Sequence, residues 1–105
     1  MKVLFDQGTP VPLRRFLHPH QVDTVAELGW SELQNGTLIK NTINSGYDVF
    51  VTTDQNLPHQ QNLKSITTRI VVLTSTSWPR IQKKADAIRD AIDNPTFQTL
   101  TIINI

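Results

Sequence analysis

The chain has 105 residues, a length that suits one domain with one hydrophobic core. Ten basic and nine acidic residues leave a formal charge of +1, which excludes an extended basic surface for nucleic acid but not a small basic patch beside an acidic site. The absence of cysteine excludes disulfides, zinc–thiolate sites and thiol nucleophiles.

The composition and the N-terminal residues also bear on location. Hydrophobic residues make up 38% of the chain and charged residues 18%, as in ordinary soluble globular proteins. No apolar run approaches the length of a membrane span, and Asp6 interrupts the first apolar run too early for a signal peptide. We therefore expect a single cytoplasmic domain over residues 1–105, without membrane contact.

Apolar runs, helical spacing and turn residues predict an alternation of strands and helices. In chain order we expect a strand at 3–5, a helix at about 10–17, a short strand at 22–25, a helix at about 35–45, strands at 49–51 and 70–73, a helix from 78 or 79 to about 93, and an edge strand at 99–103. The amide-rich segment 55–63 is predicted to be a loop with one short helix. This alternation indicates an α/β fold with a mainly parallel sheet of four or five strands.

Polar residues mark the predicted helix ends. Thr9, Asn35 and Ser77 stand where helices should begin, and each can cap the first turn with its side-chain oxygen. Gly46 follows the second predicted helix and is a natural C-terminal stop.

Two carboxylates stand directly after buried strands. Val49–Val51 is apolar at every position, as in a strand buried on both faces, and it is followed by Thr52, Thr53 and Asp54. Asp6 follows Val3–Phe5 in the same way. Parallel sheets keep their chemistry at the carboxyl ends of their strands. If the two strands are neighbours, Asp6 and Asp54 converge on one edge of the sheet.

Further polar residues lie near this predicted edge. Gln55 and Asn56 follow Asp54 directly and are candidates for contact with the substrate. Ser75 follows the next buried strand and can either face a phosphate at a helix N-terminus or help to cap that helix. Arg80, in the first turn of the same helix, is the nearest candidate for binding phosphate.

Three stretches of the sequence resemble one protein family. These are Val3-Leu4-Phe5-Asp6-Gln7-Gly8, Glu27-Leu28-Gly29-Trp30 and Val51-Thr52-Thr53-Asp54-Gln55-Asn56-Leu57, and the resemblance also takes in 73–81. They are similar to the small bacterial PIN-like domain family, which is grouped with the PIN-domain ribonucleases of toxin–antitoxin systems. The resemblance covers nearly the whole chain. It implies a three-layer sandwich and a site of clustered carboxylates that binds Mg²⁺ or Mn²⁺ and cleaves RNA, with an antitoxin protein and a second copy of the chain as further partners.

The resemblance also implies roles for individual residues. Asp6 matches the first family acid and Asp54 the acid after the third buried strand, so both are expected to be catalytic metal ligands. The second family acid corresponds to Asn35, an amide, which leaves two carboxylates where relatives have three. Glu27 and Glu32 are nearby carboxylates that would compensate. Asn35 and Glu27 have structural readings as well, Asn35 as a helix cap and Glu27 as a residue that holds a turn.

Two other functions stay open on the sequence alone. The amide at Asn35 favours a PIN-like binding module that has lost catalysis and pairs with an antitoxin-like partner. The stretch 48–58 also resembles the strand of a receiver domain that carries the phospho-acceptor aspartate, here Asp54. Receivers need a second acid after the first strand, where this chain has Gln7, and a lysine after the last strand, which the sequence lacks.

Overall fold

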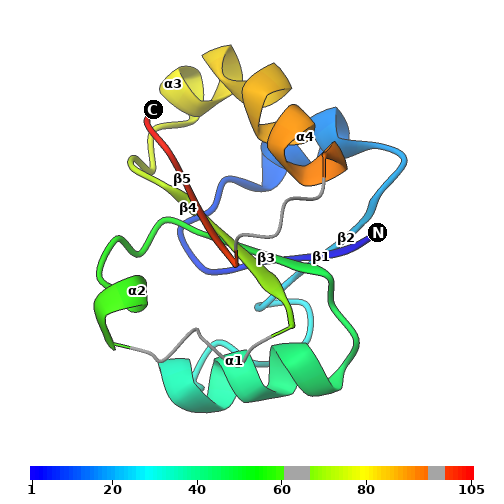
Figure 1. The fold of residues 1–105 in the computed structure, drawn as a ribbon, viewed down its shortest axis with the longest axis vertical. Coiled ribbons are helices and arrows are strands. Elements are labelled where there is room, and N and C mark those ends of the chain that lie inside the picture. Colours follow the sequence, from blue (N-terminus) through cyan, green and yellow to red (C-terminus); the bar gives the residue numbers. More distant parts are fainter. Residues whose placement is uncertain (61–66, 95–98) are drawn as a thin grey trace.

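The structure, a computed structural model, describes residues 1–60, 67–94 and 99–105 (Figure 1). Its strands are β1 (Lys2–Phe5), β2 (Gln21–Thr24), β3 (Val49–Thr52), β4 (Arg69–Leu73) and β5 (Leu100–Ile103). Its helices are the 3₁₀ helix η1 (Val11–Leu17) and the α-helices α1 (Asn35–Asn44), α2 (Leu57–Gln60), α3 (Trp78–Lys83) and α4 (Ala85–Asp93). Among the described residues, none of these helices has the length and apolar character needed to cross a membrane.

The five strands form one sheet in the order β2-β1-β3-β4-β5, and every neighbouring pair is parallel. This confirms the predicted parallel sheet and the edge position of the last strand. β1 and β3 are direct neighbours, with Phe5 paired to Val51 in the register. The carboxyl ends of the two apolar runs therefore lie side by side, as the sequence predicts.

Helices cover both faces of the sheet, because the strand residues alternate between two apolar clusters (Figure 1). One cluster joins η1, α3 and α4 to the first face, through residues that include Leu13, Leu17, Ile81, Ile88, Val51 and Leu73. The other joins α1 and α2 to the second face, through residues that include Leu38, Ile39, Leu57, Phe50 and Val72. Phe50 and Val51 point to opposite faces and are both almost fully buried, which explains why β3 is apolar throughout.

The crossovers between strands do not all have the same hand. The chain passes from β1 to β2 over the face that η1 covers. It then passes in the opposite direction along the sheet, from β2 to β3 and from β3 to β4, over the face that α1 and α2 cover. These three crossovers share one hand. The crossover from β4 to β5 continues in the same direction but uses the η1 face, so its hand is opposite. As a result α3 lies beside η1, where the Phe16 and Trp78 rings are 5.8 Å apart.

Several helix boundaries differ from the predictions. Thr9 does not cap the helix at 11–17, because Pro10 holds the cap position and the Thr9 hydroxyl donates to the Val51 carbonyl oxygen at 3.2 Å. Asn35 is the first residue of α1 rather than its cap. Ser77 holds the cap position of α3 but makes no side-chain capping bond.

The predicted helix from 78 to 93 is two helices, and other ends match the sequence. The Lys84 N–H donates three residues back, to the Ile81 carbonyl oxygen, which tightens the turn and separates α3 from α4. Gly46 ends α1 as predicted, with φ of 80° and its N–H donating to the Ile43 carbonyl oxygen. The expected short helix after β3 is α2, while residues 61–63 of the predicted loop lie outside the described residues.

Candidate functional site

The candidate site lies where β1 and β3 end. After β1 the chain crosses one face of the sheet to reach β2. After β3 it crosses the opposite face, in the opposite direction along the sheet, to reach β4. Such a switch point opens a crevice at the carboxyl ends of the two strands. Asp6 is the first residue after β1 and Asp54 the second after β3, so both carboxylates stand at this crevice.

Thr52, the last residue of β3, links the two acids. Its fully buried hydroxyl donates to the Asp6 Oδ2 atom at 2.8 Å and accepts the Asp54 backbone N–H at 3.0 Å. A single side chain thus fixes the Asp6 carboxylate and the backbone of Asp54 relative to each other. The sequence shows Thr52 only as a β-branched strand residue, a type that suits strands for other reasons.

Further hydrogen bonds orient each carboxylate. The Gln7 N–H donates to Asp6 Oδ1 at 2.9 Å, and the Asn56 N–H donates to Asp54 Oδ1 at 3.0 Å. The side chain of Asn35, in the first turn of α1, donates from Nδ2 to Asp54 Oδ2 at 3.4 Å. The structure therefore brings together three of the four residues predicted to be catalytic: Asp6, Asp54 and Asn35.

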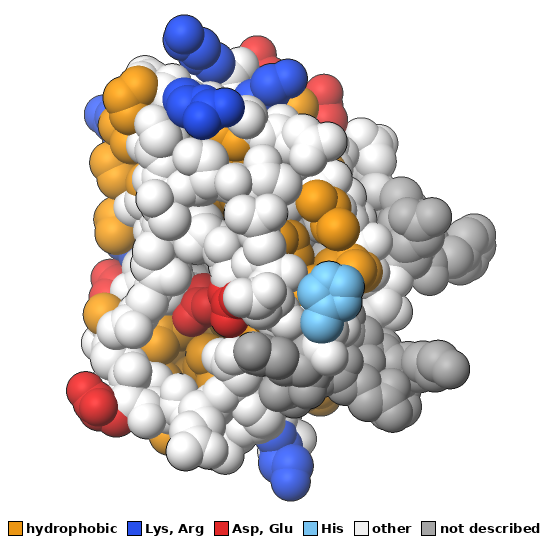
Figure 2. Space-filling view, turned by 90° about the vertical axis from the view of Figure 1, so that its left-hand side faces the viewer, with side chains coloured by type: hydrophobic (Ala, Val, Ile, Leu, Met, Phe, Trp, Pro, Cys, Tyr) orange, Lys and Arg blue, Asp and Glu red, His pale blue; other side chains and the backbone are white. Residues whose placement is uncertain are grey.

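The electrostatics of the pair favour a positive partner. Burial raises the pKa of the Asp6 carboxyl, and the charge of Asp54 raises it further, against the opposing hydrogen bonds from Thr52 and Gln7. Within residues 1–60, 67–94 and 99–105, no lysine or arginine donates to either carboxylate. Figure 2, which faces the edge where α2 and the C-terminus lie, shows acidic side chains near the centre of the surface.

The raised pKa of Asp6 predicts a particular dependence of stability on pH. Because the pKa is higher in the folded state than in the unfolded chain, the contribution of Asp6 is fully present below the unfolded pKa and is lost as the pH rises through the folded pKa. In metal-free buffer, Asp6→Asn should therefore become more stable relative to the wild type as the pH rises from about 3 to about 7. Urea unfolding at several pH values measures this difference.

The matched control for this prediction is Asp90→Asn, because Asp90 is exposed on α4. This variant measures the effect of removing one exposed negative charge, against which the pH profile of Asp6→Asn is compared. Identical pH profiles for Asp6→Asn and the wild type would contradict the assignment of a raised pKa to Asp6.

Glu27 is held away from the carboxylate pair. Its carboxylate forms an ion pair with Arg14 and accepts the Thr24 N–H at 2.9 Å, while its own N–H donates to the Thr24 hydroxyl at 3.1 Å. The ion pair with Arg14 lowers the pKa of Glu27. These contacts close the turn after β2, which is the structural reading of Glu27 that the sequence offered.

The four residues predicted to bind substrate are divided between the crevice and other contacts. Asn56 gives its backbone N–H to Asp54, and the exposed Gln55 side chain donates to the Thr74 carbonyl oxygen at 3.2 Å, bridging the ends of β3 and β4. The Ser75 hydroxyl accepts the Ser77 N–H, which matches its role near a helix start. Arg80 donates to the Ile105 carbonyl oxygen at 2.9 Å while remaining exposed on α3.

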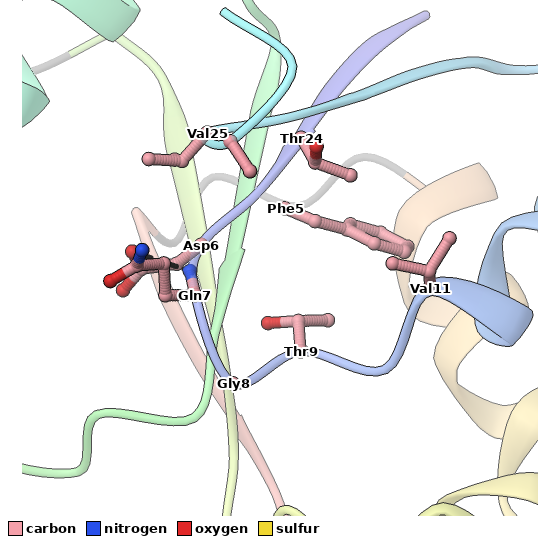
Figure 3. Close-up of a pocket in the computed structure, with 9 residues that line it drawn as sticks. Phe5, Asp6, Gln7, Gly8, Thr9, Val11, Thr24 and Val25 are labelled. Carbon is pink, nitrogen blue, oxygen red and sulfur yellow. Dashed lines mark hydrogen bonds between the residues drawn. The ribbon is translucent and has the colours of Figure 1, made fainter. Parts of the chain in front are cut away.

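A pocket of about 260 Å³ opens directly beside Asp6 (Figure 3). It lies between the turn that follows β1 and the turn that follows β2. Its lining residues are Phe5, Asp6, Gln7, Gly8, Thr9, Val11, Thr24, Val25 and Ala26. The sequence gives no signal for this pocket, because its two walls come together only through the parallel pairing of β1 with β2.

The donor set at the crevice fits a hard divalent cation. Two carboxylates and an amide side chain offer the oxygen-rich surroundings that Mg²⁺ and Mn²⁺ prefer. No third Asp, Glu, His or Cys joins them in the part of the chain that the structure describes. Comparisons of the chain with protein-family models, curated proteins and solved structures find no match.

Proposed function

We propose that this protein is a divalent-metal-dependent ribonuclease that hydrolyses RNA phosphodiester bonds at Asp6 and Asp54. One observation carries the proposal: two carboxylates are held together at the switch point of a parallel sheet, and no described lysine or arginine side chain donates to either of them. Two adjacent anions of this kind are stabilised by a cation. The resemblance of the strand-end motifs to the PIN-like family supports the same activity.

The chain's own residues would do most of the positioning. Asp6 and Asp54 would hold the cation, with Asn35 beside Asp54 in the first turn of α1. A bound Mg²⁺ or Mn²⁺ would neutralise charge on the phosphodiester and activate water as the nucleophile. Thr52 keeps the Asp6 carboxylate and the Asp54 backbone in fixed relation, so little reorganisation is needed when substrate arrives.

Exposed basic side chains on the helix after β4 suit the backbone of a single RNA strand. Arg80, Lys83 and Lys84 are exposed on and just after α3, the helix that begins beyond the carboxyl end of β4. Figure 2 shows basic side chains gathered at one end of the face whose centre is acidic. This arrangement allows phosphates to contact the basic end while one phosphate reaches the acids. The proposal implies a cytoplasmic protein, in the same compartment as its RNA substrate.

The direct test is incubation of the purified protein with labelled single-stranded RNA in Mn²⁺ or Mg²⁺. The proposal expects cleavage that stops when a chelator is added and returns when the metal is restored. Absence of cleavage with either metal, from a folded protein and a range of RNA sequences, would overturn the proposed activity.

Asn35→Asp should strengthen metal binding. The substitution puts a third carboxylate beside Asp54, and more ligand charge raises affinity for hard cations, here by about ten-fold. The control is Gln34→Glu, which adds the same charge one residue earlier, at an exposed position. Calorimetric titration of Mn²⁺ into both variants measures the effect. Equal affinities of Asn35→Asp and the wild type for Mn²⁺ would show that Asn35 is not part of the cation site.

The amide at Asn35 also favours a second function, a PIN-like binding module that lacks catalysis and pairs with an antitoxin-like protein. This alternative expects no nuclease activity in any metal and no gain of activity in Asn35→Asp. Pairing with a second copy of the chain stays a prediction from the resemblance. The receiver alternative is weaker, because Gln7 stands where a second acid is required.

A further inference from the structure

We propose that the pocket beside Asp6 receives one unpaired nucleobase of the RNA substrate, next to the phosphate at Asp6 and Asp54. The inference rests on the proposed function and adds the feature of the substrate that the site recognises. Asp6 lines the pocket (Figure 3) and also belongs to the carboxylate pair, so the pocket adjoins the crevice at this residue. A nucleotide whose phosphate lies at the acids could therefore place its base here.

The lining of the pocket suits a base better than a phosphate. No lysine or arginine is among its lining residues, and Asp6 at its edge repels anions. Val11 offers exposed methyl groups that can pack on the face of a planar ring. Thr24, another lining residue, keeps its hydroxyl proton for a ligand, since among the described residues this hydroxyl only accepts, from the Glu27 N–H. Apolar faces with a few polar edges are how proteins recognise unstacked bases.

The volume of the pocket limits the occupant. At about 260 Å³ it is smaller than the roughly 300–1,000 Å³ of sites for drug-sized ligands. It has room for a single base but not for a base pair. The substrate must therefore be single-stranded at this position.

Both walls of the pocket are fixed before any ligand binds. On one wall, Thr9 is tied to β3 through the Val51 carbonyl oxygen, and its N–H donates to the Asp6 carbonyl oxygen at 3.2 Å. On the other wall, Glu27 and Thr24 exchange hydrogen bonds across the turn, and Arg14 holds Glu27. A preformed pocket lowers the entropic cost of binding. Glu27 and Arg14 are thus positioning residues for this wall.

The exposure of Val11 points to a ligand as well. Val11 is 53% exposed and is one of three large hydrophobic side chains exposed among the described residues, with Met1 and Ile102. Met1 and Ile102 do not line this pocket, whereas Val11 does. A base seated against Val11 would cover this apolar surface.

The test compares a single-stranded RNA oligonucleotide with the same oligonucleotide carrying one abasic ribose. We expect the wild type to cleave the linkage beside the abasic position about ten-fold more slowly than the same linkage with its base present. Val11→Trp, which fills the pocket, should cleave both substrates at the slower rate. Ile102→Trp, the same change at an exposed site on β5, should keep the wild-type preference.

Two results would overturn the inference while leaving the ribonuclease intact. One is equal cleavage of both substrates by the wild type, and the other is an unchanged preference in Val11→Trp. If the wild type cleaves no RNA, the proposed function fails and the pocket is judged by binding alone. Adenosine and cytidine, which carry no phosphate, would then be titrated into the wild type and Val11→Trp. Shifts of the Gly8 and Ala26 amide resonances that occur in the wild type and not in Val11→Trp would support a base site. Absence of these shifts in the wild type would overturn the inference.

Discussion

Asp54→Asn is expected to lower the rate of metal-dependent RNA cleavage by at least about 100-fold, because loss of a direct metal ligand should exceed the 10–100-fold effect of losing an outer-shell contact. The substitution removes one of two negative charges at the crevice. It preserves the shape of the side chain, and the Oδ1 atom of asparagine can still accept the Asn56 N–H. The fold should therefore survive while the cation site is lost. A single-turnover cleavage assay in Mn²⁺ measures the effect.

The matched control is Asp48→Asn, because Asp48 and Asp54 flank the same strand at opposite ends. Asp48 precedes β3, is exposed and accepts the Lys2 N–H at 2.9 Å at the amino edge of the sheet. Asp48→Asn should keep the cleavage rate within a factor of about two, since it leaves the carboxyl edge untouched. Equal losses of activity in the two variants would mean that general destabilisation, and not the cation site, explains the result.

Gly8→Ala is expected to affect both stability and metal binding. Gly8 has φ of 88°, a conformation that costs residues with a Cβ atom about 1–3 kcal/mol, and its added Cβ would lie 2.7 Å from the Thr53 Oγ1 atom. Either the Thr53 side chain or the Gly8 backbone must then shift, and Thr53 stands between Thr52 and Asp54. We expect a loss of about 2–4 kcal/mol in the free energy of unfolding and about ten-fold weaker Mn²⁺ binding. Urea unfolding and calorimetry measure the two effects.

Gly29→Ala separates backbone strain from the close approach to β3. Gly29 also has positive φ, 73°, but its added Cβ would meet no atom within 4 Å. It should lose about 1–2 kcal/mol of stability and keep the wild-type affinity for Mn²⁺. If Gly8→Ala and Gly29→Ala bind Mn²⁺ equally well, the contact between Gly8 and Thr53 does not support the site.

The sequence predicts the sheet well because its signals are local. Val3–Phe5 and Val49–Val51 are apolar at every position, and such short runs are typical of buried parallel strands. The hand of the last crossover has no such signal. The sequence of α3 and α4 carries an apolar stripe, but that stripe would suit either face of the sheet.

The candidate site is predictable only in part, for a similar reason. Asp6 and Asp54 can be found by their positions after strands, and their proximity follows from the pairing of β1 with β3. Thr52 as the bridge between them depends on the direction of one hydroxyl, which no pattern reports. Glu27 resembled a site residue because of its neighbours in the sequence, but Arg14 lies close enough in the fold to pair with it.

Calorimetric titration of Mn²⁺ into the wild type and Asp54→Asn would show whether a cation binds at the switch point. We expect the wild type to bind Mn²⁺ and Asp54→Asn to lose that binding, with both proteins folded by circular dichroism. This result would locate a cation at the carboxyl ends of β1 and β3. Absence of binding in both folded proteins would contradict the ribonuclease proposal and favour the binding module that lacks catalysis.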